Sequence, residues 1–434
     1  MMKKIITLSL LFFCFFVFSQ NKTIVSDWTS FVQSVNVENM QNWKFRVSAK
    51  IRKGSNNISK CAIWARVDNV NNKAGFFQNL AYSDIKVTTD WNTFQITGNI
   101  SPEGKTLNIG AYAQDNGDFY FDDFKLEFFD PKPLKWVSFP LKNADFEDDL
   151  TSGKDWSEGI VKNKIIHAKN FTITTSENSP FIGKKSLLIK GENIIGNMPH
   201  GKFADVNGIK LYYETYGEGE PLLMLHGNGQ SISAFMNQVE DFSKKYKVII
   251  VDCRERGKST YDKTKELTFD IQVEDLKQFL DQQNIKKVKI LGWSDGGILA
   301  ILMALKYPDL IDKIACSGAN IFPEGLIDED LEDSKETLAK LIRENKNGEN
   351  DVYIDLYNLD LKYPNLKFED LKKIQCPSLI MAGDKDVIKT EHTVKIAESI
   401  PKGQLAIIPN STHSVVVEKP ELFNSLVIDF FEGK

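Results

Sequence analysis

Residues 288–302 read Val288-Lys-Ile-Leu-Gly-Trp-Ser294-Asp-Gly-Gly-Ile-Leu-Ala-Ile-Leu302, and this stretch decides the fold of the second half of the chain. A short apolar strand leads into a G-x-S-x-G pattern, and an apolar helix follows it. A serine at such a junction lies on a tight turn that exposes its hydroxyl group. Gly292 and Gly296 leave room for that turn. The stretch therefore predicts a strand–turn–helix unit with Ser294 as the candidate nucleophile.

Strands and helices alternate on both sides of this motif from about residue 201 onward. A hairpin with the two-residue turn Asn207-Gly208 opens the region. Alternation of this kind predicts a mostly parallel sheet that helices cover on both faces. The site of such a sheet lies at the carboxyl ends of its strands. We expect strands at residues 221–226, 247–252, 287–292, 313–317, 378–382 and 404–408, and helices at residues 272–284, 297–307, 390–400 and 420–431.

His413 is the candidate base for Ser294, because a serine hydroxyl is a weak nucleophile at neutral pH. His413 lies in a loop after the last predicted strand and before the last predicted helix. His226 lies inside a strand-end motif, and His392 lies on a predicted surface helix. The base needs a carboxylate that orients it. Two acids, Asp384 and Asp386, follow the strand at 378–382 and compete for this role.

The segment His226-Gly-Asn228-Gly ends the strand after the hairpin. Its backbone at Asn228 can donate an N–H group to an oxyanion, and the N–H group of Asp295 is the expected second donor. Each such donor typically stabilises the transition state by about 3 kcal/mol. Because backbone groups donate, the side chain of Asn228 is expected to matter less.

Three segments, Ile290–Ala300, Lys306-Tyr-Pro and Ser317-Gly-Ala-Asn, resemble the biphenyl-hydrolase-like, or valacyclovir hydrolase, branch of the α/β-hydrolase superfamily. The resemblance covers about residues 203–432 and implies cleavage of esters, including α-amino acid esters. In these families the carboxylate lies three residues after a glycine. The resemblance therefore selects Asp386 as the third member of a Ser294–His413–Asp386 triad and leaves Asp384 a structural role.

The same resemblance gives Asp295 a second role, since the acid beside the nucleophile recognises the amino group of the substrate in that branch. The alternative is that Asp295 only caps the helix that opens at Gly296.

Residues 252–259 are similar to the D-x-R-G-x-G-x-S loop of the superfamily, with Glu255 in place of the usual glycine. Arg254 of this loop is expected to be structural.

A lid is expected at residues 321–373, because this segment is too long for a simple connection between a helix and a strand. Residues 331–343 and 351–358 look helical, and we expect them to cover Ser294. The alternative is a surface insertion away from the site. The candidates for lining the acyl pocket are Phe322, Leu326, Tyr353 and Tyr357.

The first half of the chain alternates apolar and polar residues, as in Lys44–Arg52, and turn residues separate these runs. Residues 107–127 resemble the closing hairpin of jelly-roll carbohydrate-binding modules, and residues 143–148 and 183–189 resemble their opening strands. We therefore predict an all-β, jelly-roll-like sandwich at residues 20–195, followed by the α/β-hydrolase domain at 196–434. The resemblance implies a glycan as a partner of the sandwich.

The N-terminus has the pattern of a signal peptide. Lys3 and Lys4 precede an apolar run from Ile5 to Phe18, and Ser19 is a small residue at the expected cleavage site. This pattern predicts residues 1–19 as a signal peptide and a secreted or periplasmic protein. The alternative is an uncleaved anchor, but the run is shorter than the roughly 20 residues that span a bilayer. We therefore expect no stable membrane insertion.

The net charge and the cysteine spacing limit the kinds of partner and cofactor that we expect for this chain. The net charge is −5 and no long basic stretch occurs, which argues against nucleic acid as the main partner. The spacing of Cys61, Cys253, Cys316 and Cys376 fits neither a metal site nor a disulfide framework. We expect buried thiols at Cys253 and Cys316, and no metal or organic cofactor.

These observations favour a secreted serine hydrolase that cleaves carboxylic esters of small molecules through an acyl-enzyme. A peptidase, a thioesterase or a C–C bond hydrolase could use the same triad, because the fold does not determine the reaction. The remaining alternative is an inactive glycan-binding protein in which the sandwich carries the function. The complete triad argues against it.

Overall fold

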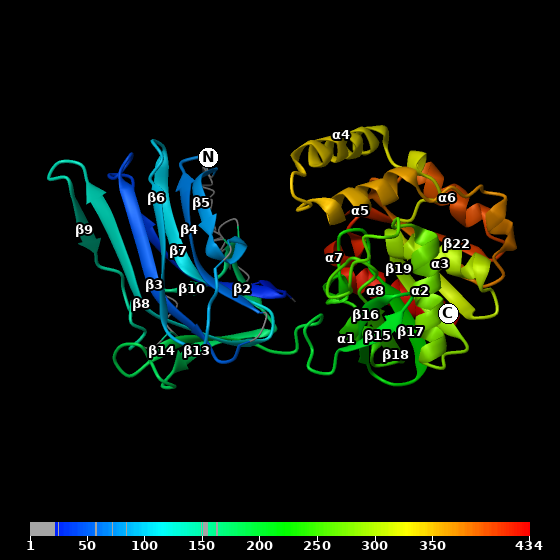
Figure 1. Cartoon of the computed structure of the whole chain (residues 1–434), viewed down its shortest axis with the longest axis horizontal. Helices are drawn as coiled ribbons and strands as arrows, with labels where there is room; N and C mark the ends of the chain where they lie inside the picture. Colours follow the sequence, from blue (N-terminus) through cyan, green and yellow to red (C-terminus); the bar gives the residue numbers. More distant parts are fainter. Residues whose placement is uncertain are drawn as a thin grey trace, which may run out of the picture. The chain divides into compact units, whose positions relative to one another are not determined.

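The computed structural model of the chain describes residues 22–24, 26–56, 59–71, 73–83, 85–148, 150, 155–161 and 164–434. The chain divides into two compact units, with the boundary between Glu192 and Asn193 (Figure 1). The predicted signal peptide, residues 1–19, lies outside the described residues. No helix in the described ranges is long and apolar enough to cross a membrane.

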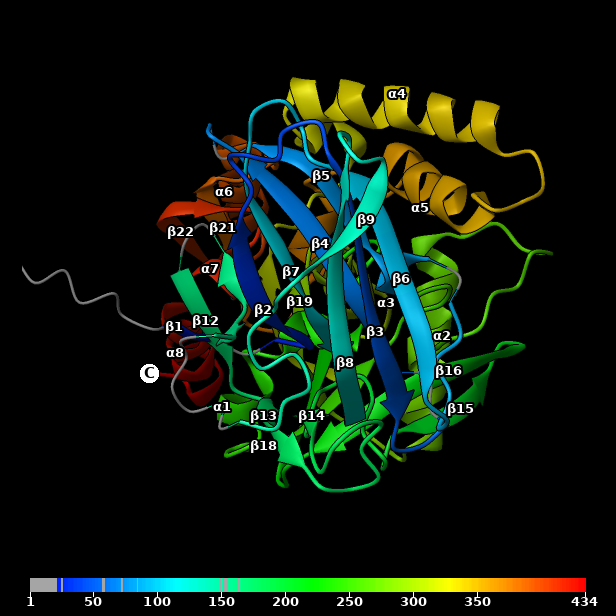
Figure 2. The same cartoon turned by 90° about the vertical axis from the view of Figure 1, so that its left-hand side faces the viewer.

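The first unit is built from strands (Figure 2), which confirms its expected strand-rich character. One antiparallel sheet has the order β10-β2-β7-β4-β5, and a second has the order β13-β14-β8-β3-β6, with β9 paired to β8. A small third sheet has the order β1-β12-β11. The jelly-roll connection pattern stays a prediction. The strands are β1 (Lys22–Ile24), β2 (Trp28–Asn36), β3 (Lys44–Lys53), β4 (Lys60–Asn69), β5 (Ala74–Asn79), β6 (Asn92–Asn99), β7 (Gly104–Gln114), β8 (Gly117–Asp130), β9 (Lys135–Phe139), β10 (Ser157–Glu158), β11 (Ile160–Val161), β12 (Lys164–Ala168), β13 (Phe171–Ser176) and β14 (Ser186–Gly191).

Residues 107–127 do not form the hairpin that their resemblance to carbohydrate-binding modules implies. β7 pairs with β2 and β4, whereas β8 pairs with β3, β9 and β14. The chain passes from one sheet to the other through Asp115 and Gly117, which both have a positive φ. This crossing allows Ile109 of β7 and Phe121 of β8 to be fully buried in different sheets.

The second unit contains one sheet of eight strands in the order β15-β16-β18-β17-β19-β20-β21-β22. The pairs β15–β16 and β16–β18 are antiparallel, and the remaining pairs are parallel. The mostly parallel sheet expected from the sequence is confirmed. The strands are β15 (Lys202–Val206), β16 (Ile209–Tyr216), β17 (Glu220–Leu225), β18 (Tyr246–Val251), β19 (Val288–Trp293), β20 (Ile311–Ser317), β21 (Ser378–Lys385) and β22 (Gly403–Thr412).

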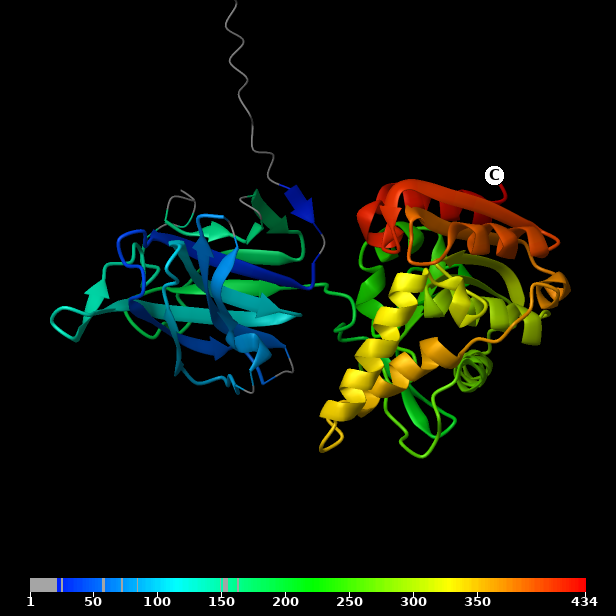
Figure 3. The ribbon, with the colours of Figure 1, turned by 90° about the horizontal axis from the view of Figure 1, so that it is seen from above.

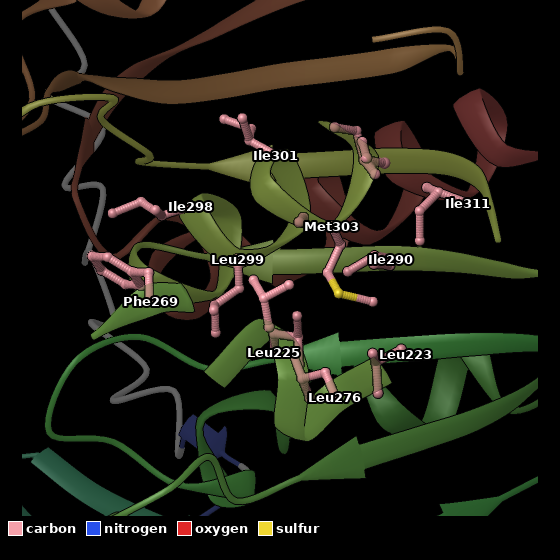
Figure 4. Close-up of a cluster of buried hydrophobic side chains, with 14 of the residues drawn as sticks. Leu223, Leu225, Phe269, Leu276, Ile290, Ile298, Leu299, Ile301, Met303 and Ile311 are labelled. Atoms are coloured by element: carbon pink, nitrogen blue, oxygen red, sulfur yellow. The ribbon is translucent and has the colours of Figure 1, made fainter. Parts of the chain in front are cut away.

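Helices cover both faces of this sheet, as expected. Leu223 and Leu225 of β17 face the apolar core that contains residues of α2 and α3 (Figure 4). Leu222 and Met224 of the same strand belong to the opposite core, with residues of α1 and α8. This alternation follows from the two-residue period of a strand that is buried on both faces. The helices outside the lid are α1 (Val239–Phe242), α2 (Phe269–Gln282), α3 (Asp295–Lys306), α6 (Thr390–Ser399), α7 (Val415–Glu418) and α8 (Pro420–Glu432).

The predicted hairpin turn is confirmed. β15 and β16 pair up to Val206 and Ile209, so that two residues form the turn. Asn207 and Gly208 have φ values of 42° and 83°. Positive φ at both positions defines a type I′ turn, whose twist matches the twist of the flanking strands.

Residues 321–373, which we call the cap segment, contain α4 (Asp328–Glu344) and α5 (Asp351–Lys362). The two helices pack against each other (Figure 3). No side chain of α4 is fully buried, whereas Leu356 and Leu359 of α5 are buried. The inner helix of the cap segment is therefore α5.

Candidate active site

Ser294 lies between the end of β19 and the start of α3, with φ 56° and ψ −119°. A residue with a side chain rarely adopts such a conformation, which costs of order 1–3 kcal/mol. Its N–H group donates to the carbonyl of Ser317 at 2.8 Å, which holds the turn against the neighbouring strand. A methyl group on Gly296 would overlap the carbonyl of Leu225, and one on Gly292 would overlap the backbone of Gly296. The glycines of the motif are therefore required by space.

His413 follows β22, and its Nδ1 lies 2.7 Å from Oδ1 of Asp386. The Asp386 side chain is fully buried at the end of β21, and it also accepts a hydrogen bond from the N–H group of Ile388 at 3.0 Å. The His413 side chain is 23% exposed, so that it can reach the pocket. The structure thus brings together the second and third members of the predicted triad.

Asp384, the competing acid, points elsewhere. Its carboxylate accepts a hydrogen bond from the N–H group of Ser411 at 3.1 Å. Hydrogen bonds from the backbone of Asn410 and Ser411 lower the pKa of Asp384. Asp384 therefore fastens the loop that carries His413 and does not contact the imidazole.

A pocket of about 230 Å³ contains Ser294 and His413 in its wall. The predicted oxyanion-hole residues Asn228 and Asp295 also line it. Asp295 is the first residue of α3, where backbone N–H groups have no partner within the helix. The backbone N–H group of Asp295 therefore has no partner within α3 and follows the serine directly. Its remaining lining residues are Gly227, Gln230, Asn320, Leu326, Asp360, Val387 and Ile388.

The aromatic residues predicted to line this pocket lie elsewhere. Phe322 packs against Phe368 and His392, with ring centroids at 5.6 and 4.6 Å. Tyr353 is 58% exposed on the outer side of α5. The inward face of α5 instead presents Leu356, Leu359 and Asp360, of which Asp360 lines the pocket. Of the four candidates, Leu326 is a lining residue.

Arg256, Asp295 and Asp360 form a cluster of ionisable side chains, of which Asp295 and Asp360 line the pocket. Arg256 donates to the carboxylate of Asp295 at 2.8 Å, and both side chains are at most 4% exposed. Arg256 also donates to Oε1 of Gln272 at 2.8 Å. Burial raises the pKa of Asp295, and the charge of Arg256 opposes that shift. Burial and the nearby charge of Asp295 raise the pKa of Asp360 well above its usual value.

Sequence reasoning missed this cluster. Arg256 occupies a variable position of its loop motif, and Asp360 lies in the cap segment, which matches no motif. One signal was present, because Asp360 follows Leu356 by four residues and so shares the buried face of α5. An acid on the apolar face of an amphipathic helix needs a partner.

The other histidines near the site are structural. His226 is buried, and its Nε2 accepts a hydrogen bond from the N–H group of Cys253 at 3.0 Å. Burial lowers the pKa of His226 to about 3. His392 is also buried rather than on the surface, because its Nε2 accepts from the N–H group of Ile321 at 3.1 Å.

Arg254 pairs with Asp275 through two hydrogen bonds of 2.8 Å, as a structural residue would. The four cysteines Cys61, Cys253, Cys316 and Cys376 are free and buried.

Comparison with known proteins identifies the family. Residues 220–348 match the alpha/beta hydrolase fold family. The serine hydrolase BPHL of Homo sapiens is 30% identical over 247 residues, which are 52% of this chain and 84% of BPHL. The chain belongs to the α/β-hydrolase family, in its biphenyl-hydrolase-like branch.

Other hydrolases are similar over about half of the chain. The (E)-2-((N-methylformamido)methylene)succinate hydrolase of Acinetobacter baylyi is 27% identical over 260 residues, which are 52% of this chain and 95% of that protein. Among solved structures, the meta-cleavage product hydrolase CumD of Pseudomonas fluorescens is 24% identical, covers 55% of this chain and 99% of its own, and has a TM-score of 0.46. As a member of the α/β-hydrolase family, the chain is a hydrolase.

Proposed function

We propose that the chain is a serine hydrolase that cleaves carboxylic esters through an acyl-enzyme. One observation carries this proposal: a single pocket contains Ser294 on its strained turn and His413, whose imidazole is held by buried Asp386. This is the arrangement that activates a serine hydroxyl. The pocket accepts a small acyl group, which favours short esters.

The mechanism has two steps. The hydroxyl of Ser294 attacks the ester carbonyl while His413 takes its proton, and Asp386 stabilises the imidazolium that forms. The backbone N–H groups of Asn228 and Asp295 stabilise the oxyanion. His413 then gives its proton to the leaving alcohol. Water attacks the acyl-enzyme in the second step, with His413 again as the base, and the acid is released.

The geometry favours Asp295 as a backbone donor over Asp295 as the partner of a substrate ammonium. Its carboxylate already has a cationic partner, Arg256, at 2.8 Å. A buried ion pair leaves little charge for a second cation, and breaking it would leave Arg256 unpaired. We therefore propose that esters without an amino group are substrates.

Activity on an ester panel tests the proposal. We expect Ser294→Ala to lose at least about a thousandfold in turnover of p-nitrophenyl acetate and to lose labelling by a fluorophosphonate probe. Ser425→Ala, at an exposed serine of α8, is the matched control and should keep both. Dipeptides and acyl-thioesters should be poor substrates, and amino-acyl esters should show no advantage over their des-amino analogues. Normal turnover in Ser294→Ala would rule out the mechanism.

Two further features of the function are proposals that rest on the sequence. The signal-peptide pattern at residues 1–19 supports a secreted or periplasmic location. The strand-rich first unit supports a glycan as its partner, which would bring the hydrolase to acylated saccharides.

A further inference from the structure

The cap segment contributes one acid, Asp360, to the wall of the catalytic pocket. This acid belongs to α5, whereas Asn228 follows β17, Ser294 follows β19 and Asp295 begins α3. The mechanism proposed above assigns no role to Asp360. A carboxyl group at this position needs a physical reason, because burying an acid is unfavourable unless it has hydrogen-bonding partners.

Asp360 has two such partners, and both are the predicted oxyanion donors. Its carboxyl group is hydrogen-bonded to the side chain of Asp295 and to the side chain of Asn228. Asn228 also donates through Nδ2 to the carbonyl of Leu356 in α5 at 3.0 Å. One helix of the cap segment thus holds the side chains of both residues that we propose as backbone donors to the oxyanion.

The contact between Asp360 and Asp295 requires a proton. Two carboxyl groups can hydrogen-bond to one another only if one of them is protonated, since an ionised carboxylate only accepts. Asp295 is the ionised partner, because Arg256 pairs with it at 2.8 Å. The proton therefore resides on Asp360, which donates to Asp295 and accepts from Asn228.

We propose that protonated Asp360 is a positioning residue that couples the cap segment to the oxyanion hole. It holds the side chains of Asn228 and Asp295, and through them the direction of the backbone N–H groups that stabilise the oxyanion. Displacement of such a donor by a fraction of an ångström weakens transition-state stabilisation more than substrate binding. The effect is therefore expected in kcat. The inference rests on the proposed ester hydrolysis at Ser294.

The coupling has a pH dependence with a defined sign. The pKa of Asp360 is raised by burial and by the nearby charge of Asp295, so that the hydrogen bond is present below that pKa and is lost as the pH rises through it. Two neighbouring carboxylates would then repel each other. The ionisable groups that face the pair are Arg256, which pairs with Asp295, and His413, which lines the same pocket. We expect kcat to fall on the alkaline side of the pKa of Asp360.

Three variants of the full chain test this proposal. Asp360→Ala should lower kcat for p-nitrophenyl acetate about 10- to 100-fold, with a smaller change in KM. Asp360→Asn should recover most of this loss, because an amide can donate to Asp295 and accept from Asn228 without titrating. The alkaline decrease of kcat should be absent in Asp360→Asn. Asp351→Asn is the matched control on the same helix, since Asp351 accepts from Nζ of Lys263 at 2.7 Å and is not among the residues that line the pocket.

A second control removes another acid that titrates nearby. Burial and the charge of Asp355 raise the pKa of Glu255 to about 7. If Glu255 causes the alkaline decrease, Glu255→Gln will abolish it and Asp360→Asn will not, which would overturn the proposal. Unchanged kcat in Asp360→Ala, or an equal loss in Asp360→Asn, would also overturn it. Fluorophosphonate labelling of every variant tests the Ser294 mechanism independently of the role of Asp360. If Asp360→Ala does not fold, the kcat and the pH profile of Asp360→Asn still test the proposal.

Discussion

Asp384 and Asp386 are two residues apart in the sequence, but their carboxylates make different contacts. β21 ends at Lys385, and the chain then turns Asp386 inward to His413 while Asp384 remains on the side of the histidine loop. Spacing in the sequence left both acids open as partners of the base. Resemblance to the family selected Asp386, which is the acid that contacts His413.

The two acids provide a matched pair of variants. Asp386→Asn should lower kcat by about 10⁴-fold, because the amide no longer stabilises the imidazolium or its tautomer. Asp384→Asn should change kcat by less than about tenfold, since the loop loses only part of one anchor. Steady-state kinetics with p-nitrophenyl acetate checks both, and thermal unfolding shows whether each variant is folded. Equal losses in the two variants would contradict the assignment.

At the level of elements, the sequence predicted the scaffold of the site better than its lining. The strands and helices of the second unit follow their periodicities, and the strand–turn–helix around Ser294 forms where the motif indicates. The pocket wall depends instead on which face of α5 is inward, and on an ion pair between Arg256 and Asp295 from distant segments. Neither follows from local patterns, because tertiary contacts decide both. The prediction of a hairpin at 107–127 was wrong for the same reason, since contacts between segments that are distant in the sequence decide which strands pair.

His392 joins two elements, because it lies on α6 and accepts a hydrogen bond from the first residue of the cap segment, Ile321. Burial lowers the pKa of His392 to about 4, below the unfolded value of about 6.5. The unfolded chain therefore binds a proton that the folded chain excludes between these values. Stability should consequently fall as the pH decreases from about 6.5 to about 4.

His392→Gln should weaken this dependence, because glutamine can accept the same hydrogen bond without titrating. Urea unfolding at pH 7 and pH 5 measures it. We expect the difference in unfolding free energy between the two pH values to shrink by up to roughly 2 kcal/mol in the variant. A difference that is as large as in the wild type would show that His392 is not responsible.

At the scale of the whole molecule, every residue that lines the catalytic pocket belongs to the second unit. The segment at the start of the second unit is hydrogen-bonded to the rest of that unit, since the N–H groups of Gly196 and Met198 donate to the carboxylate of buried Glu214 at 2.9 Å. A chain of residues 193–434 should therefore fold and hydrolyse p-nitrophenyl acetate with a kcat within about threefold of the full chain.

The same shortened chain tests what the first unit contributes. If the first unit binds a glycan, tethering raises the effective concentration of the hydrolase at a polymer, and such linkage can strengthen binding by about 10²-fold or more. Removal of the first unit should then lower the rate of acetate release from an insoluble acetylated polysaccharide by at least about tenfold. The rate on p-nitrophenyl acetate should not change, because that ester reaches the pocket by free diffusion. Equal losses on both substrates would mean that the catalytic unit needs the first unit for its structure, and no loss on either would exclude glycan tethering.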